Sequence, residues 1–112
     1  MITIYALTIT AMLRFLPSPA IVTILANDAG MQPQQAACMV RAESGWNAHA
    51  VGALGERGLW QIHPETWAWA RERMGAEQSF ALAFDEIENT RTALWLIANG
   101  YGEWWASWEN CQ

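Results

Sequence analysis

The sequence predicts a small, mainly α-helical domain with one irregular loop or short hairpin in the middle. Proline or a capping residue stands where four segments begin, and glycine stands where each of them ends. Four of the eight glycines fall within residues 45–60, which excludes a long regular element there. The 112 residues, 53% of them hydrophobic, suffice for one domain with its own core but not for two.

An apolar N-terminal segment, residues 1–16, precedes the predicted domain at residues 17–112. Arg14 interrupts its apolar run well short of the ~20 residues that a membrane-spanning helix needs, so we expect no such helix. Residues 18–20, Ser-Pro-Ala, look like a signal cleavage site, but no basic residue stands at the start of the segment. The segment is therefore either a secretory signal or a stretch that folds against the domain.

The first predicted helix covers residues 18–29. Ser18 can cap it, Pro19 suits its first turn, and Gly30 follows its end. These three residues predict both ends of the helix from local sequence alone.

The second predicted helix begins at Pro33 and ends before Gly45. Its residues at positions i, i+3, i+4 and i+7 share one face; they are Ala36, Met39, Val40 and Glu43. Glu43 therefore lies on the side of the buried residues, close to Trp46. Desolvation among apolar groups favours the protonated form of a carboxyl, which can then act as a general acid.

A third helix is predicted from Pro64 to the stop at Gly75. Trp67, Ala70, Arg71 and Met74 recur at helical spacing. We expect Arg71 and Arg73 to lie on a solvated face, because charged side chains on a helix usually do.

A fourth helix is predicted within residues 85–100, with Asp85 as its cap and Glu88 three residues on. Ile87 and Leu94 share a face of this helix. The last residues, 101–112, are expected to form a short helix or turn. Three tryptophans anchor this end of the chain: Trp104, Trp105 and Trp108.

Composition narrows the classes of function. The net charge is −5, and the six basic residues are all arginine and are scattered along the chain, which argues against nucleic acid as a partner. No metal site is expected, because His49 and His63 have no cysteine pair between them. The eight tryptophans suit a core or a sugar-binding face, and packing is the more common role.

Cys38 and Cys111 allow a single disulfide if the protein works in an oxidising compartment. Two reduced thiols are the alternative.

The stretch from Glu43 to Trp67 reads ESGWNAHAVGALGERGLWQIHPETW. It resembles the core motif of the soluble lytic transglycosylase family, which is lysozyme-like and related to goose-type lysozymes. That motif runs Glu-Ser, an aromatic, Asn, Ala-Val-Ser, Gly, Gly-Leu-Met-Gln-Ile, Pro and Thr. The positions that match it in register are Glu43, Ser44, Trp46, Asn47, Ala50, Val51, Gly55, Gly58, Leu59, Gln61, Ile62, Pro64 and Thr66.

The resemblance, which covers most of the chain from Pro17 onward, implies a lysozyme-like helical domain in which Glu43 is the catalytic acid and base. We expect five residues to bind substrate or assist the acid: Ser44, Trp46, Trp60, Gln61 and Asn89. No cofactor and no metal are implied.

The activity implied is that of a peptidoglycan lytic transglycosylase. It cleaves the β-1,4 bond between N-acetylmuramic acid and N-acetylglucosamine with one glutamate and leaves a 1,6-anhydro end. The resemblance to short phage and bacterial members implies a protein that acts outside the cytoplasm, in a virion, in the periplasm or as a secreted enzyme. We expect it to be a monomer.

Three departures from the family pattern leave alternatives open. Gly52 stands in place of a serine, Trp60 in place of a methionine, and an Ala-Tyr-Asn-Ala-Gly segment of longer members is not visible. A hydrolysing lysozyme would need a second carboxylate, for which the sequence offers Glu56, Glu65, Asp85 and Glu86. A non-catalytic wall-binding or virion structural module is the third reading.

Overall fold

The computed structural model describes residues 9–112. Its elements are α2 (Ser18–Ala29), α3 (Pro33–Ser44), α4 (Pro64–Met74), η1 (Phe80–Phe84), α5 (Glu86–Ala98), η2 (Gly102–Trp104) and η3 (Glu109–Cys111). Residues 9–13 are also helical. Within the described range the chain forms two isolated β-bridges and no strand, which confirms the predicted mainly helical domain.

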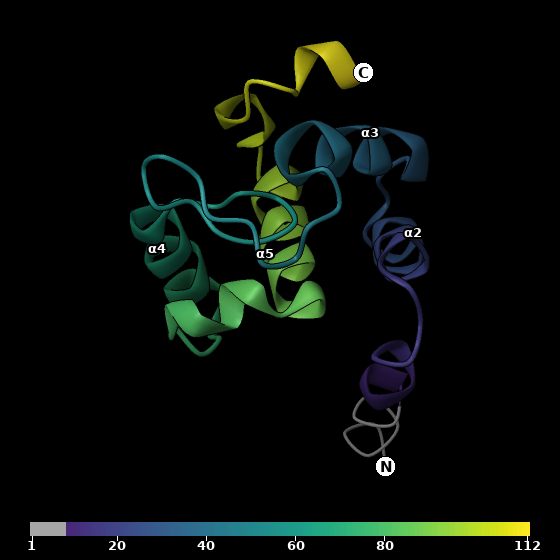
Figure 1. Ribbon diagram of the computed structural model, residues 1–112, viewed down its shortest axis with the longest axis horizontal. Helices are drawn as coiled ribbons and strands as arrows, with labels where there is room; N and C mark the ends of the chain where they lie inside the picture. The colour runs from purple at the N-terminus through teal and green to yellow at the C-terminus, as the bar shows by residue number, and fades with distance from the viewer. Residues whose placement is uncertain (1–8) are drawn as a thin grey trace.

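Helix α5 lies at the centre of the fold, with α2 and α4 packed against it (Figure 1). Its N-terminus is capped as predicted, because the Asp85 carboxylate accepts hydrogen bonds from the backbone N–H groups of Ile87 and Glu88, each at 3.0 Å. Most of its faces are buried, and Leu96 and Thr92 are fully covered. The other elements take their positions from this helix.

The predicted ends of α3 and α4 are confirmed, whereas α5 ends at Ala98 with Asn99 rather than Gly100 as its cap, and the start of α2 needs a correction. Helix α3 ends at Gly45, whose φ of 59° lies in the left-handed region that favours glycine. Ser18 does not cap α2: Pro17 occupies the cap position, and the Ser18 hydroxyl donates a hydrogen bond to the Glu86 carboxylate instead. The Ser18 hydroxyl thus binds Glu86, which the fold brings close, and not the backbone N–H groups of its own helix.

The loop after α3 folds back on itself. Arg57 forms antiparallel bridges with both Val51 and Ile62, which is the short hairpin expected after Glu43. The Arg57 guanidinium lies over two rings of η1, with its Cζ 4.3 Å from the centroid of Phe80 and 4.8 Å from that of Phe84. Helix η1 was not predicted from the sequence, because the contacts that hold it involve Arg57, a residue far away along the chain.

Arg71 corrects the expectation of a solvated arginine face on α4. Only 2% of Arg71 is exposed, and it donates hydrogen bonds to Glu88 at 3.1 Å and to Thr92 at 3.2 Å, both on α5. Arg73 is exposed as expected, with its guanidinium 4.1 Å above the Trp69 ring. The buried arginine thus joins α4 to the central helix.

The N-terminal part of the described chain contacts the domain. Leu13 is buried in the core, Arg14 forms an ion pair with Asp85, and Thr10 accepts a hydrogen bond of 3.1 Å from Arg91. The first eight residues of the predicted segment 1–16 lie outside the described residues.

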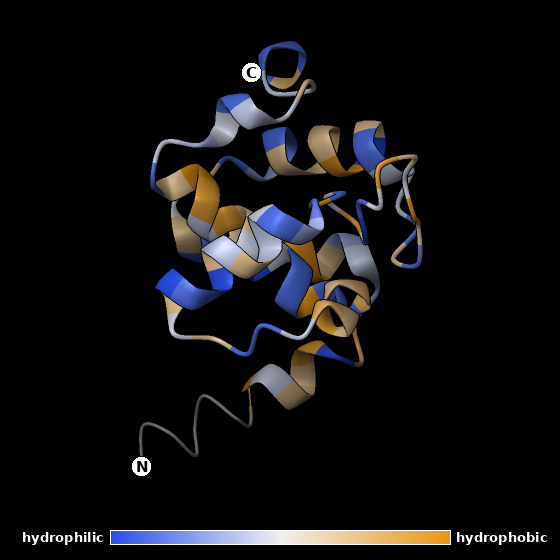
Figure 2. Cartoon of the chain, turned by 90° about the vertical axis from the view of Figure 1, so that its left-hand side faces the viewer, coloured by the Kyte–Doolittle hydropathy of each residue, from blue (hydrophilic) through white to orange (hydrophobic). Residues whose placement is uncertain are grey.

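Hydrophobic and hydrophilic residues are mixed along the helices (Figure 2). None of the helices in the described range combines the length and the apolar character needed to cross a membrane.

Cys38 and Cys111 form a disulfide, with their Cα atoms 5.6 Å apart. The bond joins α3 to η3, the last element of the chain. Of the two states that the sequence left open, the structure contains the oxidised one.

Candidate active site

Helix α3 presents Glu43 at the edge of a cleft. Ala36, Met39 and Val40 are fully buried and fix the rotation of the helix, so that Glu43, on the same face one turn later, is half-buried. Gly45 then ends the helix. The predicted stripe therefore places the carboxyl where it is reachable from solvent but held against the fold.

The cleft has a volume of about 240 Å³. Its walls come from the end of α3, the loop that leads into α4, the first turn of α4 and the C-terminal segment. The residues that line it are Glu43, Glu56, Gln61, Ile62, His63, Thr66, Trp104, Trp105 and Ala106. Acidic, amide and aromatic side chains thus meet in one hollow, a composition suited to a polar ligand with flat faces.

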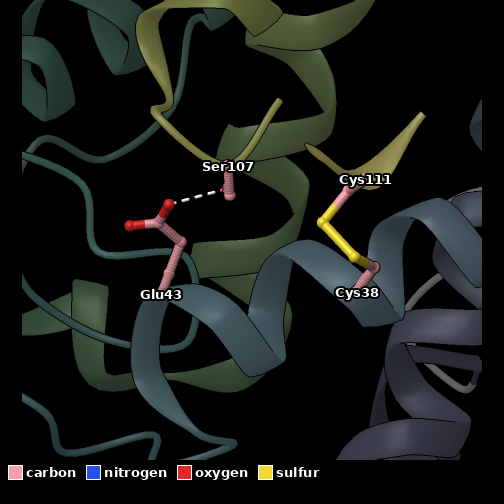
Figure 3. The surroundings of a disulfide bond; sticks show 4 residues. All are labelled: Cys38, Glu43, Ser107 and Cys111. Carbon is pink, nitrogen blue, oxygen red and sulfur yellow. Dashed lines mark hydrogen bonds between the residues drawn. A yellow bond between two sulfur atoms is a disulfide. The ribbon is translucent and has the colours of Figure 1, made fainter. Parts of the chain in front are cut away.

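The Glu43 carboxylate is held by Ser107. The Ser107 hydroxyl donates a hydrogen bond of 2.7 Å to Glu43 Oε2, and Ser107 itself is only 7% exposed. Figure 3 shows this bond, with the other carboxylate oxygen of Glu43 pointing away from Ser107. One oxygen is therefore engaged, and within residues 9–112 the other has no hydrogen-bond donor.

Glu56 is a second carboxyl group in the same cleft. Backbone N–H groups, of Glu56 itself and of Leu54 at 2.7 Å, together with the nearby His63, hold its pKa below the usual value. Glu56 is therefore a carboxylate near neutral pH. The other acids that the sequence offered as second carboxyls, Glu65, Asp85 and Glu86, do not line the cleft.

Gln61 reaches the cleft through an unusual backbone. Its φ of 51° lies in the left-handed region, which a non-glycine residue adopts at a cost of about 1–2 kcal/mol. Its amide nitrogen donates hydrogen bonds to the carbonyl groups of Ala50 at 3.1 Å and Gly58 at 3.0 Å. Those bonds fix the side chain in the wall of the cleft.

Gly52 is the position at which the motif of the resembling family has serine. A Cβ at this position would come within 2.7 Å of the Glu56 carboxyl group and 2.8 Å of Gln61 Oε1. A larger residue at this position would therefore require the ends of the Glu56 and Gln61 side chains to shift.

Trp60 and Asn89, which the sequence offered as substrate-binding residues, are buried and do not line the cleft. Trp60 is 0% exposed, and its ring nitrogen donates to Thr90 at 3.2 Å. Asn89 is equally buried and joins the loop to α5, since it accepts from the Trp60 backbone N–H at 2.9 Å and donates to the carbonyl of Arg57 at 3.1 Å. Both residues are therefore part of the packing that holds the loop between α3 and α4 against α5.

Ser44 and Trp46 lie next to the acid in sequence but outside the lining of the cleft. The Ser44 hydroxyl donates to the Val40 carbonyl of its own helix at 3.1 Å, rather than to Glu43. Trp46 is half-buried and packs against the core. Of the predicted binding residues, the structure brings Gln61 alone into the cleft beside Glu43.

Trp104 and Trp105 form the aromatic wall of the cleft. Trp105 is buried, and its ring nitrogen donates to the Trp60 carbonyl at 2.7 Å. Trp104 is 57% exposed, while Tyr101 and Trp69 support its ring at centroid distances of 4.5 and 5.6 Å. Trp104 is thus a fixed aromatic face turned to solvent.

Two residues that line the cleft, Thr66 and His63, and one that contacts the acid, Ser107, were not predicted as site residues, each for a different reason. Thr66 belongs to the quoted motif and could have been taken from it, whereas His63 was weighed only as a metal ligand. Ser107, which touches the acid, has no local signal at all, because 64 positions separate it from Glu43.

Comparison with known proteins gives one family. The sequence pattern described as the transglycosylase SLT domain matches residues 21–111. No curated protein matches the chain significantly. In the described range, 9–112, no group of three or more histidine, cysteine, aspartate or glutamate residues could hold a metal ion.

Proposed function

The chain belongs to the transglycosylase SLT domain family, and from this premise we propose that it is a peptidoglycan lytic transglycosylase. It cleaves the β-1,4 bond between N-acetylmuramic acid and N-acetylglucosamine, with Glu43 as the only acid and base. The observation that carries the proposal is the half-buried Glu43 in the cleft, with one carboxyl oxygen bound by Ser107 and the other without a donor among the described residues.

One carboxyl group can complete this reaction. Protonated Glu43 gives its proton to the glycosidic oxygen as the bond from C1 of the muramoyl residue breaks. The resulting carboxylate then accepts the proton of the muramoyl 6-hydroxyl, whose oxygen bonds to C1 and closes the 1,6-anhydro ring. Glu43 ends the cycle protonated, and no water is consumed.

The cleft supplies the groups that bind a sugar chain. Trp104 offers an exposed ring on which the apolar face of a sugar can stack. The Gln61 amide, fixed by two loop carbonyl groups, offers its oxygen to a sugar hydroxyl or acetamido N–H group. We therefore assign substrate binding to these two residues.

Digestion of purified peptidoglycan tests the proposal. We expect mass spectrometry of the released fragments to show 1,6-anhydro-muramoyl ends. The Glu43→Gln variant should lose activity by a factor of about 10²–10⁴, the usual contribution of a general acid or base, and should keep its thermal midpoint. Full activity in that variant would refute the assignment, and retention on the wall with no release would favour a non-catalytic wall-binding module.

Hydrolysis is a second candidate, favoured by one observation: the Glu56 carboxylate lines the same cleft as Glu43. Its lowered pKa keeps it charged near neutral pH, as a base that activates water must be. Reducing ends in place of anhydro ends would identify this route. Glu56→Gln should then lose activity by a factor of about 10² or more, whereas the transglycosylase route predicts a small change.

The protein is proposed to act outside the cytoplasm as a monomer. Peptidoglycan lies there, and the Cys38–Cys111 disulfide suits an oxidising compartment.

A further inference from the structure

Two links join the acid-bearing helix to the end of the chain. One is the hydrogen bond from Ser107 to Glu43, and the other is the disulfide between Cys38 and Cys111 (Figure 3). Both run between α3 and the same short C-terminal segment. The covalent link therefore lies four positions from the residue that supplies the hydrogen bond.

The segment between Ser107 and Cys111 is short and internally bonded. The Cys111 backbone N–H donates to the Ser107 carbonyl at 3.1 Å, which forms one turn. On the other side, Cys38 and Glu43 are five residues apart on a regular helix, which corresponds to a rise of about 7.5 Å. Residues 107–111 and residues 38–43 are thus two short, internally bonded segments that connect the disulfide to the Ser107 hydroxyl and to the Glu43 carboxyl. Through them the disulfide restricts the position of the hydroxyl relative to the carboxyl.

Neighbouring residues offer no substitute for this contact. Ser44 directs its hydroxyl to the Val40 carbonyl, and Gly52 carries no hydroxyl. Within residues 9–112, Ser107 is the one side-chain donor bound to the Glu43 carboxylate. A glutamate has three rotatable side-chain bonds, so an unsupported carboxyl would sample several positions along the edge of the cleft.

From these contacts we propose that Ser107 is a positioning residue for Glu43, and that the Cys38–Cys111 disulfide holds Ser107 in place, so that full catalytic activity requires the oxidised chain. The inference rests on the proposed role of Glu43 as acid and base. Ser107 fixes one carboxyl oxygen, which directs the other toward the glycosidic oxygen. Misplacement of a catalytic group by about 1 Å can cost two orders of magnitude in rate.

Ser107→Ala tests the first half of the proposal. We expect kcat to fall roughly 10- to 100-fold while KM changes less than about twofold, because the variant displaces the acid without altering the sugar contacts. Ser107→Thr keeps the hydroxyl and should recover most of kcat. Ser79→Ala, an exposed serine away from the cleft, is the matched control. An unchanged kcat in Ser107→Ala, or a loss that Ser107→Thr does not recover, would overturn the assignment.

Removal of the disulfide tests the second half. Cys38→Ala with Cys111→Ala should lower kcat by a similar factor at a temperature where circular dichroism shows a folded protein. In the Ser107→Ala background, the same pair of changes should have little further effect, since Ser107 is the residue through which the disulfide acts. Losses that simply multiply would show that the disulfide acts on catalysis by another route.

Crystal structures of wild type and Ser107→Ala provide a readout that does not depend on activity. We expect the Glu43 carboxyl to occupy one position in wild type and to leave it in the variant. A wild type without activity on peptidoglycan would refute the proposed function, whereas an unmoved carboxyl in Ser107→Ala would refute the positioning role alone.

Discussion

Gly55 and Gly58 show how single residues shape the loop beside the acid. Both have a left-handed backbone, with φ of 87° and 82°. A Cβ added to Gly55 meets nothing closer than 3.9 Å, whereas one added to Gly58 would lie 2.2 Å from the Ala83 carbonyl and 2.5 Å from the Asn89 amide. Gly58 is therefore required both by its left-handed backbone and by the lack of space for a Cβ, whereas Gly55 is required by its backbone alone.

The two alanine variants of these glycines should differ in stability. Gly55→Ala should lower the free energy of unfolding by about 1–2 kcal/mol, the cost of a left-handed backbone for a residue with a Cβ. Gly58→Ala should cost about 1–3 kcal/mol more, because neighbouring backbone must also move. Urea denaturation followed by circular dichroism measures both. Equal losses would show that the contact with Ala83 has little weight.

Trp104 carries a prediction about substrate affinity. Trp104→Ala should raise KM roughly tenfold with little change in kcat, because a stacked aromatic contact is worth about 1–1.5 kcal/mol. Trp104→Phe keeps a flat ring and should retain most of the affinity. Steady-state kinetics on a soluble glycan fragment separates the two constants. A wild-type KM in Trp104→Ala would remove this ring from the sugar-binding surface.

At the scale of elements, one arginine joins α4 to the central helix. Arg71 reaches Glu88 and Thr92 of α5, donates to the Glu77 carbonyl at 2.8 Å, and lies 4.8 Å from the centroid of the Trp67 ring. Its helical spacing with Trp67 already placed it on the apolar face, but its charge suggested solvent. Hydrogen bonds from Nε and Nη1 to partners outside α4 offset part of the cost of burying the charge.

Arg71→Met should therefore lower the free energy of unfolding by about 2–4 kcal/mol, because it leaves Glu88 without its buried partner. Arg73→Met, on the exposed side of the same helix, should cost at most about 1 kcal/mol. Chemical denaturation of both variants under the same conditions gives the comparison. Similar losses would indicate that the buried network adds little to stability.

At the scale of the whole molecule, the disulfide closes most of the chain into a loop. Cys38 and Cys111 are separated by 73 positions, and the enclosed part contains the whole cleft. A cross-link of this span restricts the unfolded chain and thereby stabilises the folded one. The first described helices, 9–13 and α2, lie outside the loop and are held by packing and polar contacts.

Reduction should destabilise the protein by about 2–4 kcal/mol, which lowers the thermal midpoint by roughly 10–15 °C for a domain of this size. Differential scanning calorimetry with and without reductant measures the change. The Cys38→Ala, Cys111→Ala variant is the control, since its midpoint should not respond to reductant. A midpoint of wild type that is equally insensitive would mean that the disulfide does not form in solution.

The sequence by itself determined the approximate extent of the four α-helices α2 to α5 and which face Glu43 occupies. These features depend on interactions within about one helical turn: proline in the first turn, an Asp85 cap, and glycine such as Gly45 at the end. Ser18 shows the limit of such local rules, because Glu86 in another helix takes its hydrogen bond.

Only the tertiary structure decided what surrounds the acid. It turned Glu56 and Trp104 into the cleft, buried Trp60 and Asn89, and brought Ser107 to Glu43 across 64 positions of sequence. Contacts over such separations depend on how the helices pack around α5. That packing cannot be predicted from residue type and local spacing alone. The position of Glu43 can thus be predicted from the pattern of its own helix, whereas its contact with Ser107 is determined by the tertiary structure.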